Sequence, residues 1–192
     1  MINPFAIFTS WFEQAKTHPQ ITEPTAMSLA TCANNQPSLR IVLLKDYDEQ
    51  GFVFYSNTTS QKGRELEQNQ HAALCFYWAA LDKQVRIIGV AEQVDAATSD
   101  AYFASRTREK QIGAWASLQS SPMANRAEFE QRIAEITAKY EGIDVPRPPH
   151  WVGWRVKPNR IEFWQQQDHR WHHREVFVIN DAGEWSSGLI YP

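Results

Sequence analysis

The first apolar pattern along the chain has a helical period and begins almost at once. Asn3 followed by Pro4 is typical of an N-cap with proline at the first helical position. The apolar residues that follow share one helical face: Phe5, Phe8, Phe12 and Ala15. The pattern predicts an amphipathic first helix.

Between residues 26 and 94 the pattern changes to short apolar runs separated by turn residues. The runs are Ala26–Thr31, Ser38–Asp46, Phe52–Asn57, Ala72–Trp78 and Gln84–Val94. Asn34-Asn35-Gln36-Pro37 and Asp48-Glu49-Gln50-Gly51 supply the turn chemistry that connects hairpin strands. Antiparallel strands are therefore predicted, interrupted by one short helix over Gln61–Gln68 that opens at Ser60.

The middle third of the chain returns to helical spacing. Helices are predicted over Ser99–Arg106 and Arg108–Ala116, and a longer one begins near Asn125. Asn125 and Glu128 have the spacing of a capping box. The expected buried face of this last helix consists of Phe129, Ile133, Ile136 and Tyr140.

Strand-like runs resume after the stiff Pro-rich connector at residues 144–149. They cover Trp151–Val156 and Arg160–Gln165, and a final hairpin runs from Trp171–Ile179 around Asp181-Ala182-Gly183 to Trp185. The sum is about eight strands and four helices, with the strands clustered in sequence and no internal repeat. An antiparallel α+β barrel-like fold is favoured over a parallel α/β sheet.

Composition narrows the class of protein. The chain has 192 residues, of which 43% are hydrophobic, so one domain over residues 1–192 is expected. A net charge of −3 gives no global basis for binding nucleic acid or an anionic membrane. Cys32 and Cys75 lie inside apolar runs, so we interpret both as core residues of a protein in a reducing compartment. Since neither a leader nor a membrane span is evident, a cytoplasmic location is expected.

Two segments around the early strands could bind an anion. Arg40-Ile41-Val42-Leu43-Leu44-Lys45 is an apolar strand between two cations, and strand periodicity places Arg40 and Lys45 on opposite faces. A core strand with solvated ends is the alternative. The segment 55–64 runs from a strand into a helix start, where free N–H groups, hydroxyls, Lys62 and Arg64 could hold a phosphate. Ordinary helix capping by Ser60 is the alternative there.

Two later segments carry further polar groups. Tyr102 and Arg106 are four residues apart on a predicted helix, so a hydroxyl and a guanidinium could grip one phosphate, with Arg108 and Lys110 nearby. A solvated basic helix face is the alternative.

Near the C-terminus, an extended His169–Arg174 would place Arg170, His172 and Arg174 on one face, as in a ligand wall. The clustered histidines leave a metal site open, but His172 and His173 would point oppositely and no Cys or carboxylate completes a ligand set, so no metal is expected.

Taken together, these segments resemble the pyridoxamine 5'-phosphate oxidase family, in family order across nearly the whole chain. The matching motifs are Glu23-Pro24-Thr25-Ala26-Met27, Arg40 to Lys45, Tyr55-Ser56-Asn57, Gln111-Ile112-Gly113-Ala114-Trp115, Gln119-Ser120-Ser121, Ile161-Glu162-Phe163-Trp164 and Arg170-Trp171-His172. The resemblance implies an FMN-binding split β-barrel with flanking helices. It also implies a homodimer in which each flavin site is built from both chains, and dimerisation and substrate-site strands at about 151–192.

The resemblance further implies the residues of the site. Those around the flavin would be Arg40, Ile41, Val42, Leu43, Leu44, Lys45, Tyr55, Ser56, Gln61, Lys62, Gln84, Gln119, Ser120, Trp164 and Arg174. Those that bind the substrate would be Lys45, Tyr102, Arg106, Lys110, Arg170, Trp171 and His172. Arg170 would assist at the reacting carbon and His172 would position the pyridine ring. The implied reaction oxidises pyridoxamine or pyridoxine 5'-phosphate to pyridoxal 5'-phosphate, with O2 as acceptor and H2O2 as second product.

Several positions depart from the family pattern. Gln61 stands where many relatives carry arginine, Lys110 where a serine is common, and His173 where an acidic residue is usual. The ending Gly188-Leu189-Ile190-Tyr191-Pro192 lacks the arginine that relatives have before the leucine. A related FMN oxidase with another substrate, as in phenazine assembly, and a non-catalytic binder of FMN or pyridoxal phosphate are the two alternatives.

Overall fold

The computed structural model describes residues 3–192, so Met1 and Ile2 of the predicted domain lie outside the described residues. The first helix, α1 (Pro4–Thr17), begins where the sequence predicts, because the Asn3 side chain accepts a hydrogen bond from the Phe5 N–H and Pro4 occupies the first turn. Its buried residues include the predicted face of Phe5, Phe8, Phe12 and Ala15. This prediction is confirmed.

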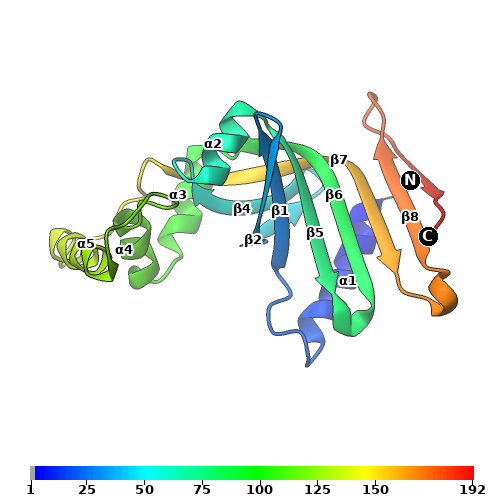
Figure 1. The fold of residues 1–192 in the computed structure, drawn as a ribbon, viewed down its shortest axis with the longest axis horizontal. Helices are drawn as coiled ribbons and strands as arrows, with labels where there is room; N and C mark the ends of the chain where they lie inside the picture. The colour runs from blue at the N-terminus through cyan, green and yellow to red at the C-terminus, as the bar shows by residue number, and fades with distance from the viewer. Residues whose placement is uncertain (1–2) are drawn as a thin grey trace.

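One antiparallel sheet forms the body of the protein (Figure 1). Its strands are β1 (Ala26–Ala33), β2 (Gln36–Leu43), β3 (Asp46–Asp48), β4 (Gly51–Asn57), β5 (His71–Trp78), β6 (Lys83–Gln93), β7 (Trp151–Gln165), β8 (His173–Ile179) and β9 (Trp185–Leu189). They pair in the order β2-β1-β5-β6-β7-β4-β3, and β8 joins β7 and β9. The sheet does not close on itself, and with its flanking helices it confirms the predicted α+β class.

The remaining elements lie between and beside the strands. The helices are α2 (Gln61–Gln68), α3 (Ala96–Ala104), α4 (Arg108–Ala116) and α5 (Arg126–Lys139), with short 3-10 turns η1 (Ala79–Leu81) and η2 (Asp168–Arg170). The bounds of α4 are those that the sequence predicts. Asn125 caps α5 by accepting from the Glu128 N–H, whereas the Glu128 carboxylate accepts from Ala124 rather than from Asn125. No helix within residues 3–192 is both long and apolar enough to cross a membrane.

The main core lies between α1 and one face of the sheet. The Phe8 ring packs edge-on against Phe52 and Phe76 from β4 and β5, and Trp11 packs against Phe163 of β7. In the view of Figure 1, α1 lies behind the sheet. A smaller cluster that includes Phe103, Ile112, Tyr140 and Trp151 joins α3, α4 and the α5 end to the sheet. Helix α5 itself is only half-buried on its predicted face.

Three predicted segments differ in the structure. The run Ser38–Asp46 is broken, because the chain leaves β2 after Leu43 and starts β3 at Asp46. The two predicted strands Trp151–Val156 and Arg160–Gln165 form the single strand β7, which stays paired with β6 across a bulge near Gly89.

The third difference lies before β8. His169 and Arg170 have positive φ angles of 56° and 66°, so Arg170 lies in the turn η2 rather than on an extended strand. The predicted shared face of Arg170, His172 and Arg174 is therefore wrong. Cys32 and Cys75 are half-buried free thiols and not fully buried core residues.

Gly63 fixes how closely α2 approaches the end of β4. A Cβ at this position would lie 2.2 Å from the Thr58 carbonyl oxygen, which is backbone and cannot turn away. We expect Gly63→Ala to lower the free energy of unfolding by about 3 kcal/mol. Urea unfolding measures this change.

Gly113→Ala is the matched control, since it is inside α4 and its added Cβ would have no atom within 4 Å apart from its chain neighbours and its own helix backbone. Alanine should raise the free energy of unfolding there by up to about 1 kcal/mol. Equal effects of the two substitutions would contradict the packing argument.

Candidate functional site

A cavity of about 470 Å³ opens where the helical end of the protein meets the sheet. Its walls come from β2 and β4, from the start of α2, and from α3 and α4. The predicted site residues that line it are Ile41, Val42, Leu43, Lys45, Tyr55, Ser56, Lys62, Tyr102, Arg106, Lys110 and Gln119. We call this cavity the cationic pocket, because it has four basic and no acidic lining residues.

Lys62 is the most enclosed cation of the pocket. It lies in the first turn of α2, which Ser60 caps by accepting from the Gly63 N–H. The Lys62 Nζ donates to the Ser56 and Ser60 hydroxyls at 3.1 and 3.2 Å, and to Gln119 Oε1 at 2.9 Å. All three acceptors are neutral. Burial, together with the nearby Arg40 charge, lowers the pKa of Lys62 to about 8.

Arg106 sits on an aromatic wall at the opposite side of the pocket. Its guanidinium lies 4.8 Å from the centroid of the Trp151 ring, and Trp151 stacks with Tyr55, which in turn stacks on Tyr102. The Arg106 Nη1 is buried without a hydrogen-bond partner, and burial lowers the pKa of this side chain. Such an orphaned donor marks a place where an external acceptor is missing.

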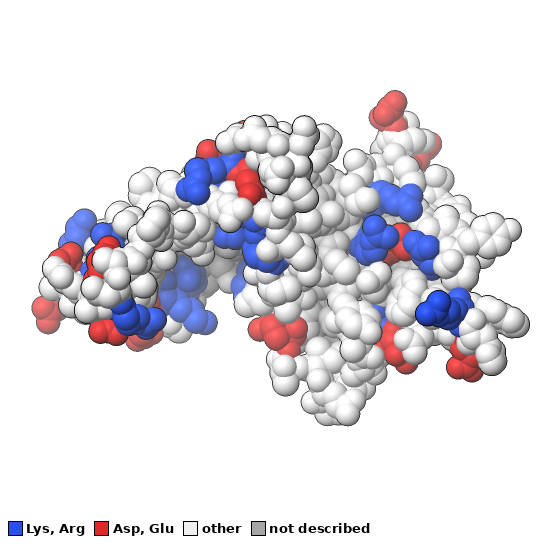
Figure 2. All heavy atoms as spheres, in the orientation of Figure 1, with Lys and Arg blue, Asp and Glu red and all other residues white. Residues whose placement is uncertain are grey.

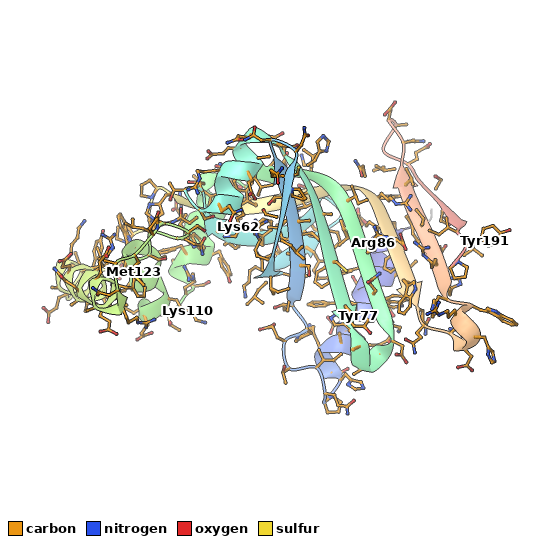
Figure 3. The ribbon with its side chains drawn as sticks, viewed as in Figure 1. Lys62, Tyr77, Arg86, Lys110, Met123 and Tyr191 are labelled. Atoms are coloured by element: carbon orange, nitrogen blue, oxygen red, sulfur yellow. The ribbon has the colours of Figure 1, made fainter. Side chains whose placement is uncertain are left out.

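The charge of the pocket is not balanced within the described residues 3–192. None of Lys45, Lys62, Arg106 and Lys110 forms an ion pair there. Figure 2 shows basic side chains along the hollow beside α2 and α4, and Figure 3 shows that Lys62 and Lys110 belong to this end of the molecule. Because unpaired cations in a partly dry cavity attract anions strongly, the pocket fits a ligand with one or more phosphates.

Other predicted residues lie at the rim of the pocket or behind it. Arg40 forms an ion pair with Glu65 of α2 at 3.0 Å, so it braces the strand against this helix, and Gln61 donates to the same carboxylate. Hydrogen bonds from Ser38, Thr31, Gln61 and Arg40 overcome the effect of burial and hold the pKa of Glu65 at about 2. Leu44 is buried in the core, and Ser120 lines a neighbouring hollow together with Gln119.

A second group of predicted residues lies at the other end of the sheet. Gln84, Trp164 and Arg174 are cross-strand neighbours on β6, β7 and β8, so their side chains share one sheet face. Trp171, His172 and Arg174 line a hollow beside the C-terminal segment, and Arg170 is exposed in η2 next to it. Among residues 3–192, the clustered histidines do not join other ligands in a group that could hold a metal ion.

The two groups are far apart in one chain. Trp151 of the cationic pocket and Trp164 of the second group stand near opposite ends of β7, which spans up to roughly 40 Å when extended. In Figure 1, α3 and α4 lie at one end of the molecule and β8 lies at the other. One chain therefore does not bring all predicted site residues together.

Sequence reasoning missed Trp151 and Asn57, which also line the pocket. The two residues are register partners on β7 and β4, about a hundred positions apart in sequence. No local signal marks them, because only the pairing of β4 with β7 places Trp151 beneath Arg106.

Two family profiles together match nearly the whole chain. The family profile described as "Pyridoxamine 5'-phosphate oxidase" matches residues 14–140. A second profile, described as "Pyridoxine 5'-phosphate oxidase C-terminal dimerisation region", matches residues 151–192.

Several relatives share about half of their residues with this chain. A pyridoxine/pyridoxamine 5'-phosphate oxidase of Sphingopyxis alaskensis is 52% identical over 99% of this chain and 88% of its own length. The protein of the same name from Myxococcus xanthus is 52% identical, with 99% and 92% covered. The one from Zymomonas mobilis is 49% identical, with 99% and 98% covered.

Two solved structures have a similar fold. PhzG from Burkholderia lata, crystallised with tetrahydrophenazine-1-carboxylic acid, has a TM-score of 0.92 at 29% identity, covering 99% of this chain and 93% of its own. A pyridoxamine 5'-phosphate oxidase-related, FMN binding protein of Nostoc punctiforme has a TM-score of 0.78 at 17% identity, covering 100% and 98%. At that identity the second likeness concerns the fold alone.

Proposed function

Because this chain belongs to the pyridoxamine 5'-phosphate oxidase family, we propose that it is an FMN-dependent oxidase that converts pyridoxamine or pyridoxine 5'-phosphate to pyridoxal 5'-phosphate. The observation that carries the proposal is the unbalanced charge of the cationic pocket. Four basic side chains without carboxylate partners suit two phosphate groups, one from the cofactor and one from the substrate.

The two phosphates would bind at opposite ends of the pocket. Lys62, held among Ser56, Ser60 and Gln119 at the start of α2, would bind the FMN phosphate, where the helix N-terminus adds a favourable field. Arg106 and Tyr102 would bind the substrate phosphate with Lys45 and Lys110. The orphaned Nη1 of Arg106 would then gain the acceptor that it lacks.

A second copy of the chain would complete the site. Within residues 3–192, one sheet face has no helix on it (Figure 1), and it exposes Leu39, Ile41 and Tyr77, at 68%, 63% and 60% of their surfaces. Cross-strand pairing puts Gln84, Trp164 and Arg174 on this same face, since Tyr77 is the register partner of Gln84. A patch of this kind is typical of a protein interface. A homodimer packed through it would bring the second group of one chain to the cationic pocket of the other.

The roles of the chain's own residues follow from this arrangement. FMN held in the pocket would supply hydride-accepting chemistry, with O2 as the final acceptor and H2O2 as the second product. The phosphate contacts fix one end of the substrate, so the reacting carbon is held in place by binding energy from a remote group. Arg170 and His172 would cover the pyridine ring from the partner side and exclude water from it.

The proposal is tested on purified protein. The visible absorption spectrum shows whether flavin is bound. Pyridoxamine or pyridoxine 5'-phosphate is then added in air, and the formation of pyridoxal 5'-phosphate and H2O2 is measured. Flavin without turnover of either vitamer would exclude the proposed activity. Oxidation of a phenazine precursor in that case would favour the related oxidase suggested by PhzG, whereas no turnover at all would favour a binding protein.

Cofactor affinity should fall at alkaline pH because of Lys62. With a pKa of about 8, its amine is positive at pH 7 and mostly neutral at pH 9. Burial raises the pKa of the Tyr55 and Tyr102 phenols from the usual tyrosine value, away from this window. We expect the Kd for FMN to rise roughly tenfold between pH 7 and pH 9.

Quenching of flavin fluorescence during titration of the apoprotein measures this Kd. Lys62→Arg is the control, because a guanidinium keeps its charge throughout and should give a flat profile. Parallel pH profiles of the two proteins would show that another group controls the affinity.

A further inference from the structure

Glu162 is a buried carboxylate on the sheet face that carries no helix from the described part of the chain. Only 3% of its side chain is exposed, and it stands near the C-terminal end of β7. Arg86 is its register partner on β6, and Arg160 lies two residues earlier on its own strand. Figure 2 shows basic atoms gathered around one acidic position over β6 to β8, and Figure 3 labels Arg86 there.

The strongest contacts of Glu162 are with Arg174. The Arg174 Nε and Nη2 donate to Glu162 Oε1 at 2.9 and 2.7 Å, and its Nη1 donates to the Tyr191 carbonyl at 2.9 Å. Arg86 donates to the other carboxylate oxygen at 3.1 Å, and Arg160 lies 3.7 Å from it. The guanidinium of Arg174 is therefore held from two sides, and its remaining N–H groups are left for an external acceptor.

The cluster is not a balanced ion pair. It contains three guanidiniums and one carboxylate among the described residues. An excess of positive charge is a poor way to stabilise a sheet, since buried ion pairs contribute little even when they are balanced. The arrangement suits a different purpose, namely the fixing of one flexible cation in one direction.

We propose that Glu162 is a positioning residue for Arg174 and, through it, for the flavin bound in the partner chain's cationic pocket. This inference rests on the proposed function, which places Arg174 against FMN across the dimer. Glu162 touches neither cofactor nor substrate. It orients the guanidinium before the cofactor arrives, so that the bound state need not order a free side chain.

A double-mutant cycle on the full-length protein tests the proposal. The Kd for FMN is measured by titration of the apoprotein in the wild type, Glu162→Gln, Arg174→Gln and the double variant. We expect Glu162→Gln to weaken FMN binding about tenfold, because a neutral amide cannot hold the guanidinium with the same bond. The double variant should bind FMN no more weakly than Arg174→Gln alone. Additive losses, or an unchanged Kd in folded Glu162→Gln, would overturn the proposal.

The visible absorption band of the bound flavin gives a second readout. At saturating FMN, Glu162→Gln and Arg174→Gln should shift this band in the same way, whereas a loss of sheet stability alone would not move it. Arg86→Gln is the matched control, since it removes another partner of Glu162 but leaves the Arg174 bonds in place. It should keep the Kd and band of the wild type, and a loss equal to that of Glu162→Gln would overturn the proposal.

Arg174→Lys tests the same proposal if the Glu162→Gln protein does not fold. Arg174→Lys keeps the charge but lacks the two donors that reach Glu162 Oε1. It should bind FMN as weakly as Arg174→Gln, and an affinity equal to that of the wild type would overturn the proposal. Failure of the wild type itself to bind FMN would instead reject the proposed function.

Discussion

The Lys62→Met protein is expected to purify without bound flavin, with a Kd for FMN raised about a hundredfold. Methionine keeps most of the length and apolar volume of the side chain but removes the buried cation. Ser56, Ser60 and Gln119 then lose their shared donor, and the start of α2 faces the phosphate with one charge fewer. Absorbance of the purified protein and titration of the apoprotein measure the loss.

Riboflavin separates this effect from general damage. Since it lacks the phosphate, it should bind Lys62→Met and the wild type equally. Lys16→Met is the matched control, because Lys16 lies on α1, outside the cationic pocket, and forms its ion pair with Glu13 at the surface. A Lys62→Met protein that retains as much FMN as the wild type would remove Lys62 from the phosphate site.

The Arg170→Ala protein is expected to stay yellow but to lose at least about a hundredfold in turnover. Arg170 lies outside the cationic pocket, so its loss leaves the Lys62 contacts intact. Its proposed place is over the substrate ring, where it would stabilise charge at the reacting carbon. Stopped-flow absorbance measures the rate at which substrate reduces the flavin without oxygen. This rate isolates the reductive step from reoxidation of the flavin.

His169→Ala is a close control for the Arg170 substitution. Both residues have a positive φ in the same turn, and alanine keeps the Cβ at either position, so the two substitutions should change the backbone strain to a similar extent. His169→Ala should keep most of the turnover of the wild type. Equal losses in the two variants would mean that the shape of η2, and not the Arg170 side chain, limits the reaction.

Mixing the Lys62→Met and Arg170→Ala proteins tests whether each site takes residues from both chains of the dimer. If each site takes Lys62 from one chain and Arg170 from the other, a mixed dimer has one intact site and one site with both defects. Random exchange in an equal mixture would restore about one quarter of the wild-type sites. No recovery after demonstrated subunit exchange would show that both residues act within one chain.

Local patterns were sufficient for most of the secondary structure. The N-cap at Asn3, the helix over Arg108–Ala116 and the start of α5 at Asn125 follow from capping residues and helical spacing, which act within a few positions. The hairpin turn at Asn34 and Asn35 is equally local, because both residues adopt the left-handed conformation that Asn tolerates.

Errors arose where a distant contact decides the local conformation. An apolar run continues through Leu44, but the Leu44 N–H donates to Thr25 and the Lys45 N–H donates to Val53, which turns the chain away from β2. Pro158 does not end β7, since the bulge opposite Gly89 accommodates it. The turn at η2 likewise has no periodic signal.

The sequence by itself determined the family and the antiparallel α+β class, and it predicted the types of side chain in the candidate site. Helical spacing also predicted that Tyr102 and Arg106 lie together, and both line the pocket, although α3 ends at Ala104 and Arg106 lies just beyond it. Only the tertiary structure decided that Trp151 lies under Arg106, that Lys62 is buried among neutral acceptors, and that β7 separates the two groups of site residues. The reason is physical: periodicity fixes which residues share a face of one element, whereas register and packing between elements distant in sequence fix which faces meet.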